Sequence, residues 1–283
     1  MTWTSDQIPD QTGRTAVVTG GGSGLGLIVA AGLAQRGARV IMAVRDTARG
    51  EAARADLQGD VEVRRLDLLD LDSVRAFASE VDAVDLLVNN AGVAGQAHTL
   101  SPQGHGSHFA TNHLGHFALT GLLLPRLTKG IEPRVVTVSS YMYRYGRFGE
   151  RRGYSHTRAY ADSKLANVLF GLELHRRLEA AGSPVGSYLA HPGMARTPLQ
   201  GKNSSRLQAV LGTAMARIVG RSAEEGALPL LYAATAREAP SATMIGPGRR
   251  AAPAQEPLRP VATDLEAAHA LWELSESATG VRY

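Results

Sequence analysis

Cysteine is absent from this chain of 283 residues, and long apolar runs are absent too. The first absence excludes disulfides and thiolate metal sites, and it fits a reducing compartment. No stretch approaches 18 uncharged apolar residues, so the sequence predicts no membrane-spanning helix. Residues 1–14 are polar and lack the apolar core of a signal peptide, and we therefore expect a cytoplasmic protein.

Lysine is scarce, since only three of the 30 basic residues are lysines: Lys129, Lys164 and Lys202. The 26 acidic residues leave a net charge of +4, and both signs are dispersed along the chain. Dispersed charge is typical of a solvated surface, whereas a nucleic-acid interface needs basic residues clustered on one face. We therefore expect no nucleic-acid partner. Because lysine is rare in this chain, a lysine that lies within a motif is more easily explained by a specific role than by chance.

The apolar pattern of the first two thirds alternates short β-branched runs with longer helical stretches. It predicts strands at residues 15–19, 39–44, 61–66, 84–88, 134–138 and 185–189, and helices at 24–36, 47–57, 70–80, 109–127 and 158–181. Such alternation indicates repeated βαβ units. The predicted fold class is therefore α/β: a single-domain, doubly wound parallel sheet of the Rossmann type with helices on both faces.

Domain boundaries follow from the same pattern. We interpret residues 1–283 as one domain, with an N-terminal extension at 1–13, a cofactor-binding and catalytic core at 14–193, and a substrate-covering C-terminal region at 194–283. Within that last region, Ser222 to Glu225 and Thr263 to Glu266 have the spacing of capping boxes and predict helix starts. The stretch 246–260, rich in Pro, Gly and Arg, is predicted to be a loop.

A glycine-rich turn joins the first predicted strand to the first predicted helix, at residues 19–26. Glycines there allow a tight turn and let a pyrophosphate approach the backbone N–H groups at the helix N-terminus. A purely structural turn is the alternative, but the strand–turn–helix context favours dinucleotide binding. The candidate cofactor-binding residues of this turn are Gly20, Gly22, Ser23, Gly24, Leu25 and Gly26.

The end of the second predicted strand bears on the choice between NAD and NADP. Val44 stands where an NAD-selecting carboxylate is expected, and Arg45, which follows it, is suited to a 2′-phosphate. A shift of the strand end by one residue would make Asp46 the selecting group and favour NAD, and Arg45 can also be read as a surface charge. We favour NADP(H) over NAD(H).

Tyr160 and Lys164 are separated by one helical turn and share a helix face. A free tyrosine ionises near pH ~10. A neighbouring ammonium and an oxidised nicotinamide would lower that pKa toward neutrality, which suits a general acid/base. A Tyr/Lys pair at this spacing also occurs by chance on helix surfaces, but the scarcity of lysine favours a role for Lys164.

Several motifs occur together in one order along residues 15–200, and the sequence thereby resembles the short-chain dehydrogenase/reductase family, in particular its retinol-dehydrogenase-like branch. The matching residues are Thr19-Gly20, Gly24, Gly26, Asp67, Asn89-Asn90-Ala91-Gly92, Asn112, Ser139-Ser140, Tyr160, Lys164, Pro192-Gly193 and Thr197. The branch is further indicated by Asn112 to Phe117, Ser163 to Asn167 and Leu271 to Ser275. That branch generally uses NADPH, in agreement with Arg45.

The resemblance implies a catalytic set of four residues. Tyr160 is the expected general acid/base, and Ser140, rather than Ser139, is expected to steady the substrate oxygen. Lys164 is expected to hold the nicotinamide ribose and to lower the pKa of Tyr160, while Asn112 holds a water that connects Lys164 to solvent. The implied reaction moves hydride between the nicotinamide and a carbonyl or alcohol of a hydrophobic small molecule.

The resemblance also implies further cofactor contacts. Asp67 and Leu68 are expected at the adenine, with Asn90, Ala91 and Gly92 on the adenosine side. Pro192, Gly193 and Thr197 are expected to flank the nicotinamide. Family members often assemble as homo-dimers or homo-tetramers through the two long helices, so either assembly is expected as an option here.

An insert separates Ser140 from Tyr160 and combines aromatic residues with arginines at positions 144, 147, 151, 152 and 158. It is interpreted either as a solvated lip or as a contact for an acidic or aromatic substrate.

Five histidines lie close together upstream, at 98, 105, 108, 113 and 116. A zinc site prefers three or four convergent ligands with supporting carboxylates, so packed or exposed imidazoles are favoured and no metal is expected.

Two other function classes remain open. One is a non-catalytic NADP-binding sensor or regulatory protein of the same fold, which would usually have lost the tyrosine or the lysine. The other is a methyltransferase built on a similar glycine turn, which would leave the Tyr/Lys pair and the segment 89–92 unexplained.

Overall fold

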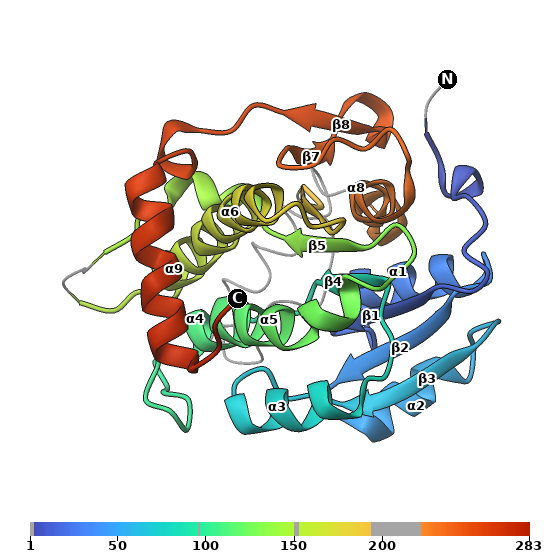
Figure 1. Ribbon diagram of the computed structural model, residues 1–283, viewed down its shortest axis with the longest axis horizontal. Coiled ribbons are helices and arrows are strands. Elements are labelled where there is room, and N and C mark those ends of the chain that lie inside the picture. The colour runs from blue at the N-terminus through green and yellow to red at the C-terminus, as the bar shows by residue number, and fades with distance from the viewer. Residues whose placement is uncertain (1–2, 96, 150–152, 194–221) are drawn as a thin grey trace, which may run out of the picture.

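A computed structural model describes residues 3–95, 97–149, 153–193 and 222–283 of the chain. Its centre is an eight-stranded sheet in the order β3-β2-β1-β4-β5-β6-β7-β8, which Figure 1 shows with helices on both sides. The strands are β1 (Thr15–Thr19), β2 (Arg39–Val44), β3 (Val61–Arg65), β4 (Leu86–Asn89), β5 (Arg134–Val138), β6 (Gly186–Ala190), β7 (Met244–Pro247) and β8 (Pro253–Glu256). All neighbouring pairs are parallel except β7 and β8.

The strand order reverses between β1 and β4, which defines a doubly wound sheet and confirms the predicted fold class. In such sheets, ligands bind beyond the carboxyl ends of the strands at this switch point. The helices are α1 (Gly24–Ala34), α2 (Thr47–Arg54), α3 (Leu71–Glu80), α4 (Ser107–Phe109), α5 (Gly115–Leu127), α6 (His156–Ala180), α8 (Ala223–Thr235) and α9 (Leu265–Thr279). In the part of the chain that the structure describes, no helix is both long and apolar enough to cross a membrane.

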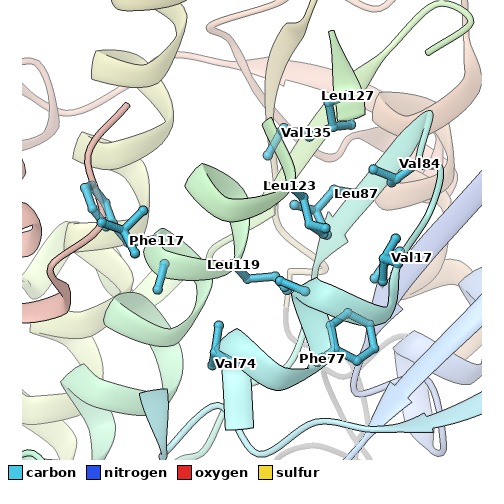
Figure 2. Packing of buried hydrophobic residues seen from close by; sticks show 14 of the residues in the cluster. Val17, Val74, Phe77, Val84, Leu87, Phe117, Leu119, Leu123, Leu127 and Val135 are labelled. Carbon is cyan, nitrogen blue, oxygen red and sulfur yellow. The ribbon is translucent and has the colours of Figure 1, made fainter. Parts of the chain in front are cut away.

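The core consists of apolar side chains that alternate between the two faces of the sheet. In β1, Val17 packs with α3, α5 and α6, whereas Ala16 and Val18 pack with α1 and α8. Figure 2 shows the first of these layers, where Phe77 of α3 and Leu123 of α5 lie over the sheet. Because both faces are covered, β1, β4 and β5 are buried throughout and β2 is buried except at its first residue, and this explains their continuous apolar runs.

The long helix expected at 109–127 is interrupted. It begins at Ser107, and residues Ala110–Leu114 form a π-helical turn before α5. π-helical turns within α-helices occur frequently at functional sites. Asn112, one of the predicted catalytic residues, lies in this turn.

Two predictions for the last third are wrong. Residues 246–260 are not a loop throughout, because they contain the end of β7, a single 3₁₀ turn (Arg249–Ala251) and the antiparallel edge strand β8. These strands have four residues each and pair Pro247 with Pro253, so they give no clear period-two pattern. The last helix is capped by Asp264, whose side chain accepts from Ala267 N at 3.0 Å, and not by a box beginning at Thr263.

The capping box at Ser222 is confirmed. The Ser222 hydroxyl accepts from Glu225 N at 3.1 Å, and the Glu225 carboxylate accepts from Ser222 N at 3.0 Å. Both ends of the box thereby satisfy backbone donors at the start of α8. The helix then packs against α1 on one face of the sheet.

Helix α9 packs across α5 and α6, the two long helices expected to carry subunit contacts (Figure 1). The ring of Trp272 lies 5.1 Å from that of Phe117 and 5.9 Å from that of Phe170, measured between centroids, and Arg177 lies over its other side at 4.3 Å. Trp272 is fully buried as a result. A second copy binding these helices would therefore have to lie beside α9 or displace it.

Candidate active site

The glycine-rich turn lies between β1 and α1, as predicted. Gly20 and Gly24 adopt positive φ angles of 67° and 55°, which favour glycine. A Cβ on Gly26 would overlap the carbonyl oxygen of Gly20, so the helix can approach the strand end only without a side chain there. The turn is thus a cradle in which the N-terminus of α1 is open to an anionic group.

Thr19 and Asn90 hold this turn in place. The Thr19 hydroxyl oxygen accepts from Asn90 N and Ala91 N, both at 2.9 Å, and the Asn90 side-chain amide donates to Thr19 O at 2.7 Å. The side chain of Asn90, expected at the adenosine, is therefore engaged in bracing the end of β1 against the end of β4. Ala91 and Gly92 line the neighbouring cavity.

A cavity of about 220 Å³ lies at the switch point. Most of the predicted adenosine-side residues line it: Gly20, Gly22, Ser23, Arg45, Asp67, Leu68, Ala91 and Gly92. Gly24, Leu25 and Gly26 lie in the first turn of α1 instead. Arg49 and Thr111 also line the cavity and were missed by the sequence reasoning, since nothing local marks them.

The second strand ends at Val44, as predicted, so Arg45 is the first residue after it. Asp46 is the N-cap of α2, and its Oδ1 accepts from Arg49 N at 3.0 Å. One carboxylate oxygen of Asp46 is thus occupied by the backbone. Arg45 and Arg49 are both exposed and both line the cavity, beside Asp46 and Asp67.

Ser140 and Tyr160 meet across the carboxyl end of β5. The Ser140 hydroxyl is close enough to the phenol of Tyr160 to act on its pKa, and it also accepts from Met142 N at 3.3 Å. Tyr160 is half-buried. Burial raises the pKa of Tyr160, and Ser140 is the influence that lowers it. The neighbouring Ser139 is buried, and its hydroxyl donates to the backbone carbonyl of Lys164 at 2.8 Å. Of the two serines, only Ser140 is placed at the phenol.

Lys164 lies one turn after Tyr160 and is buried, with 3% of its surface exposed. Its Nζ donates to Val138 O at 3.1 Å and lies 5.9 Å from the centre of the Tyr160 ring. Burial lowers the pKa of Lys164 to about 8. The influences on the pKa of Tyr160 in this structure are burial, which raises it, and Ser140, which lowers it. The expected effect of Lys164 together with an oxidised nicotinamide stays a prediction.

Gly92 gives Lys164 its space, because a Cβ there would lie 3.3 Å from Nζ and 3.4 Å from Asn112 Oδ1. The Asn112 side chain is fully engaged: Oδ1 accepts from Val93 N at 2.7 Å, and Nδ2 donates to Val93 O and to the Ser163 hydroxyl. Both side-chain amide hydrogens are therefore used, and the backbone carbonyl of Asn112 has His116 Nδ1 at 3.0 Å. The water expected at Asn112 stays a prediction.

Pro192 and Gly193 follow β6, whose carboxyl end is next to that of β5. Gly193 has a φ of 68°, and its N–H donates to Nδ1 of His191 at 3.0 Å. Thr197 and the covering segment 194–221 lie outside the described residues.

The geometry thus brings the glycine turn, Ser140, Tyr160 and Lys164 to one edge of a doubly wound sheet, and the comparisons with known proteins agree. The sequence model described as short chain dehydrogenase matches residues 14–208. The chain belongs to the short-chain dehydrogenase/reductase family. It is 42% identical to dehydrogenase/reductase SDR family member 13 of Bos taurus, with 95% of this chain and 74% of that protein covered.

Other members of the family match over nearly the whole chain. Human retinol dehydrogenase 12 is 38% identical, with 99% of this chain and 90% of that protein covered. A crystal structure of an uncharacterised protein from Mycobacterium paratuberculosis is 45% identical, with a TM-score of 0.84 and coverage of 100% and 99%. The likeness extends through α9, well beyond the residues that carry the family motifs.

The structure describes part of the insert that precedes Tyr160. Arg144 is paired with Glu256 of β8 at 2.8 Å and has a side-chain exposure of only 14%, so the interpretation as a solvated lip is wrong for this residue. Arg147 and Arg158 are exposed, while Arg151 and Arg152 lie outside the described residues. A substrate contact of the insert stays a prediction.

The clustered histidines have separate partners. His116 Nε2 lies 2.9 Å from the Thr19 hydroxyl and His113 Nε2 lies 2.8 Å from that of Ser275. Burial lowers the pKa of His113 to about 3 and that of His116 to about 4, so both rings are neutral. Across the described ranges, no group of three or more His, Asp or Glu side chains is arranged to hold a metal ion.

Proposed function

We propose that the protein is an NADP(H)-dependent oxidoreductase that interconverts a carbonyl and an alcohol on a hydrophobic small molecule. The observation that carries this proposal is the grouping of Ser140, Tyr160 and Lys164, in which Ser140 acts on the phenol and Lys164 Nζ lies 5.9 Å from the centre of its ring. This group lies on the same edge of the sheet as a glycine turn that can accept a pyrophosphate. The bound cofactor supplies or accepts the hydride. Everything else in the reaction falls to side chains of this chain.

Tyr160 is proposed to transfer the proton at its phenolic oxygen. Because burial raises its pKa, the phenol is protonated near neutral pH, as a proton donor in carbonyl reduction must be. The Ser140 hydroxyl lies within reach of the same oxygen and would donate to the substrate oxygen as negative charge develops there. Lys164, with a pKa of about 8, would carry the positive charge of the site at neutral pH.

NADP(H) is proposed as the preferred cofactor because two arginines, Arg45 and Arg49, line the 220 Å³ cavity. The two carboxylates that also line it, Asp46 and Asp67, each accept a backbone hydrogen bond, from Arg49 N and Leu69 N. Guanidinium groups pair well with phosphate, often through two parallel hydrogen bonds. The arrangement therefore favours a 2′-phosphate over a bare ribose.

The proposed substrate class is a hydrophobic aldehyde, ketone or alcohol. It is supported by the names of relatives such as human retinol dehydrogenase 12, which the chain matches nearly end to end. The test is a panel of carbonyl compounds that includes all-trans-retinal and small polar aldehydes, followed by NADPH consumption with the intact chain. We expect turnover to increase with the apolar area of the substrate. NADPH binding without turnover of any panel member would instead support a sensor, and the absence of NADPH binding would overturn the proposal.

A further inference from the structure

Three side chains from distant parts of the sequence meet behind the Pro192–Gly193 turn. Arg144 belongs to the 3₁₀ helix Tyr141–Tyr145, which follows Ser140. His191 directly follows β6, and Glu256 is the last residue of β8. Oε2 of Glu256 lies 2.8 Å from Arg144 Nη2 and 3.1 Å from His191 Nε2. We infer that these residues are positioning residues that fix the Pro192–Gly193 turn for nicotinamide binding, an inference that rests on the proposed function.

The ring of His191 has a defined proton arrangement. Its Nδ1 accepts from Gly193 N at 3.0 Å, so the proton of the neutral ring is on Nε2, which faces Glu256. The contact with Glu256 is bent rather than linear, and charge–dipole attraction therefore dominates it. A protonated ring would lose its acceptor for Gly193. His191 is 1% exposed, so solvent cannot replace either partner.

Glu256 keeps its charge because of these neighbours. The contact with His191 and the charge of Arg144 lower its pKa, although burial opposes them. The ionised carboxylate accepts a hydrogen bond from Arg144 and attracts the Nε2–H of the ring, so it favours that form of His191. The same carboxylate thereby links the segment after Ser140 to the turn at Gly193. These segments follow β5 and β6, which are neighbours in the sheet.

Gly246 of β7 makes room for this pair. A Cβ at that position would overlap the Glu256 carboxylate and lie 2.6 Å from His191 Nε2. Its φ is not positive, so the backbone itself does not require glycine there. The side chains of His191 and Glu256 fill the space beside β7. This is independent support for a close contact between Glu256 of β8 and His191.

The consequence is a chain of contacts from β8 to the expected nicotinamide side of the site. Gly193 is held by one hydrogen bond from its N–H, in a left-handed conformation, directly before the segment 194–221. If that bond is lost, the turn has other conformations available, and binding of the cofactor must then order it. The free energy of this ordering is subtracted from the binding free energy, so the Kd for the cofactor should rise.

The test is a matched pair of His191 variants. His191→Asn keeps an acceptor near the position of Nδ1 and loses the group that faces Glu256, whereas His191→Gln keeps a donor toward Glu256 and loses the acceptor for Gly193. The Kd for NADPH is measured by fluorescence titration of the intact chain, with thermal unfolding as the control for folding. We expect His191→Gln to weaken NADPH binding by about tenfold and His191→Asn by about threefold or less, the size of one hydrogen bond.

A second pair covers the case in which the histidine variants do not fold. Glu256→Gln keeps an acceptor beside the imidazole, and Glu256→Leu removes it. We expect Glu256→Leu to weaken NADPH binding several times more than Glu256→Gln does. Equal Kd values within both pairs, with folded proteins, would overturn the inference. A wild-type chain that does not bind NADPH would instead overturn the proposed function, so the two failures are distinguishable.

Discussion

Ser139 and Lys164 are joined by a hydrogen bond in which the serine hydroxyl donates to the lysine's backbone carbonyl at 2.8 Å. This bond fixes the end of β5 to the middle of α6, and it thereby sets the position of the next serine, Ser140, relative to Tyr160 on the preceding turn. The two adjacent serines thus have separable roles: Ser139 fixes β5 to α6, and Ser140 acts on the phenol of Tyr160.

The first prediction concerns these two serines. Ser140→Ala removes the group that lowers the pKa of Tyr160, so the pH profile of alcohol oxidation, which needs the phenolate, should shift to higher pH. It also removes the long N-cap bond from Met142 N, and should cost about 0.5–1 kcal/mol of unfolding free energy. Ser139→Ala removes a buried bond to the Lys164 carbonyl, which keeps its helical partner in α6, and should cost about 0.5–1.5 kcal/mol without shifting the pH profile. The pH dependence of the oxidation rate and denaturant melts, measured for both variants, check this prediction. Identical effects of Ser140→Ala and Ser139→Ala on the pH profile would contradict separate roles for the two serines.

The second prediction concerns Lys164, whose pKa is lowered by burial from 10.5 to about 8. Between those pH values the unfolded chain binds more protons than the folded one, so stability from this group rises with pH. Below about pH 8 its buried charge costs stability. Lys164→Met should therefore raise the unfolding free energy near neutral pH by about 1–3 kcal/mol while abolishing turnover.

Denaturant melts of wild type and Lys164→Met near neutral pH and at about pH 10 test this. The advantage of the variant should shrink toward the higher pH. A variant that is less stable at neutral pH would show that the bond from Nζ to Val138 outweighs the desolvation.

The third prediction concerns cofactor choice at Arg45 and Arg49. Arg45→Ala should raise the Kd for NADPH by about tenfold or more and leave that for NADH nearly unchanged, since a charge-assisted hydrogen bond to a phosphate is involved. Arg49→Ala should act in the same direction. Arg158→Ala, an exposed arginine that does not line the cavity, is the control. Equal losses for both cofactors would mean that these side chains do not contact a 2′-phosphate.

The fourth prediction concerns the packing of α9. Trp272→Ala removes a buried ring that contacts Phe117 and Phe170, and should cost about 3–5 kcal/mol of unfolding free energy. The KM values of the protein that remains folded should change little, because the ring is not part of the described cavity at the switch point. Sedimentation of the wild type and the variant would also reveal whether exposing this face of α5 and α6 promotes self-association.

The sequence was most informative where function depends on local spacing. The glycine turn, the Tyr160–Lys164 pair and the six central strands are encoded by neighbours along the chain, and their positions were predicted closely. Contacts between distant segments had no such signal. Glu256 reaches His191 only because β8 pairs antiparallel with β7, and Asp264, rather than Thr263, caps α9 because of the local backbone path.

The π-helical turn at Asn112 shows the same limit. The spacing of the motifs singled out Asn112, but it could not show that its side chain is bound to Val93 and Ser163, which lie 19 and 51 residues away. Likewise, the pKa of Tyr160 depends on how deeply the phenol is buried, and the pairwise argument from Lys164 did not include that burial.

The central claim is that the phenolic oxygen of Tyr160 transfers the proton in a hydride-transfer reaction. The most direct measurement is a single-turnover experiment with Tyr160→Phe, NADPH and a carbonyl substrate accepted by the wild type, with NADPH binding measured separately. The account predicts that the variant binds NADPH within about threefold of wild type and loses at least about a hundredfold in the rate of hydride transfer. A variant that binds NADPH and reduces the substrate at the wild-type rate would contradict it.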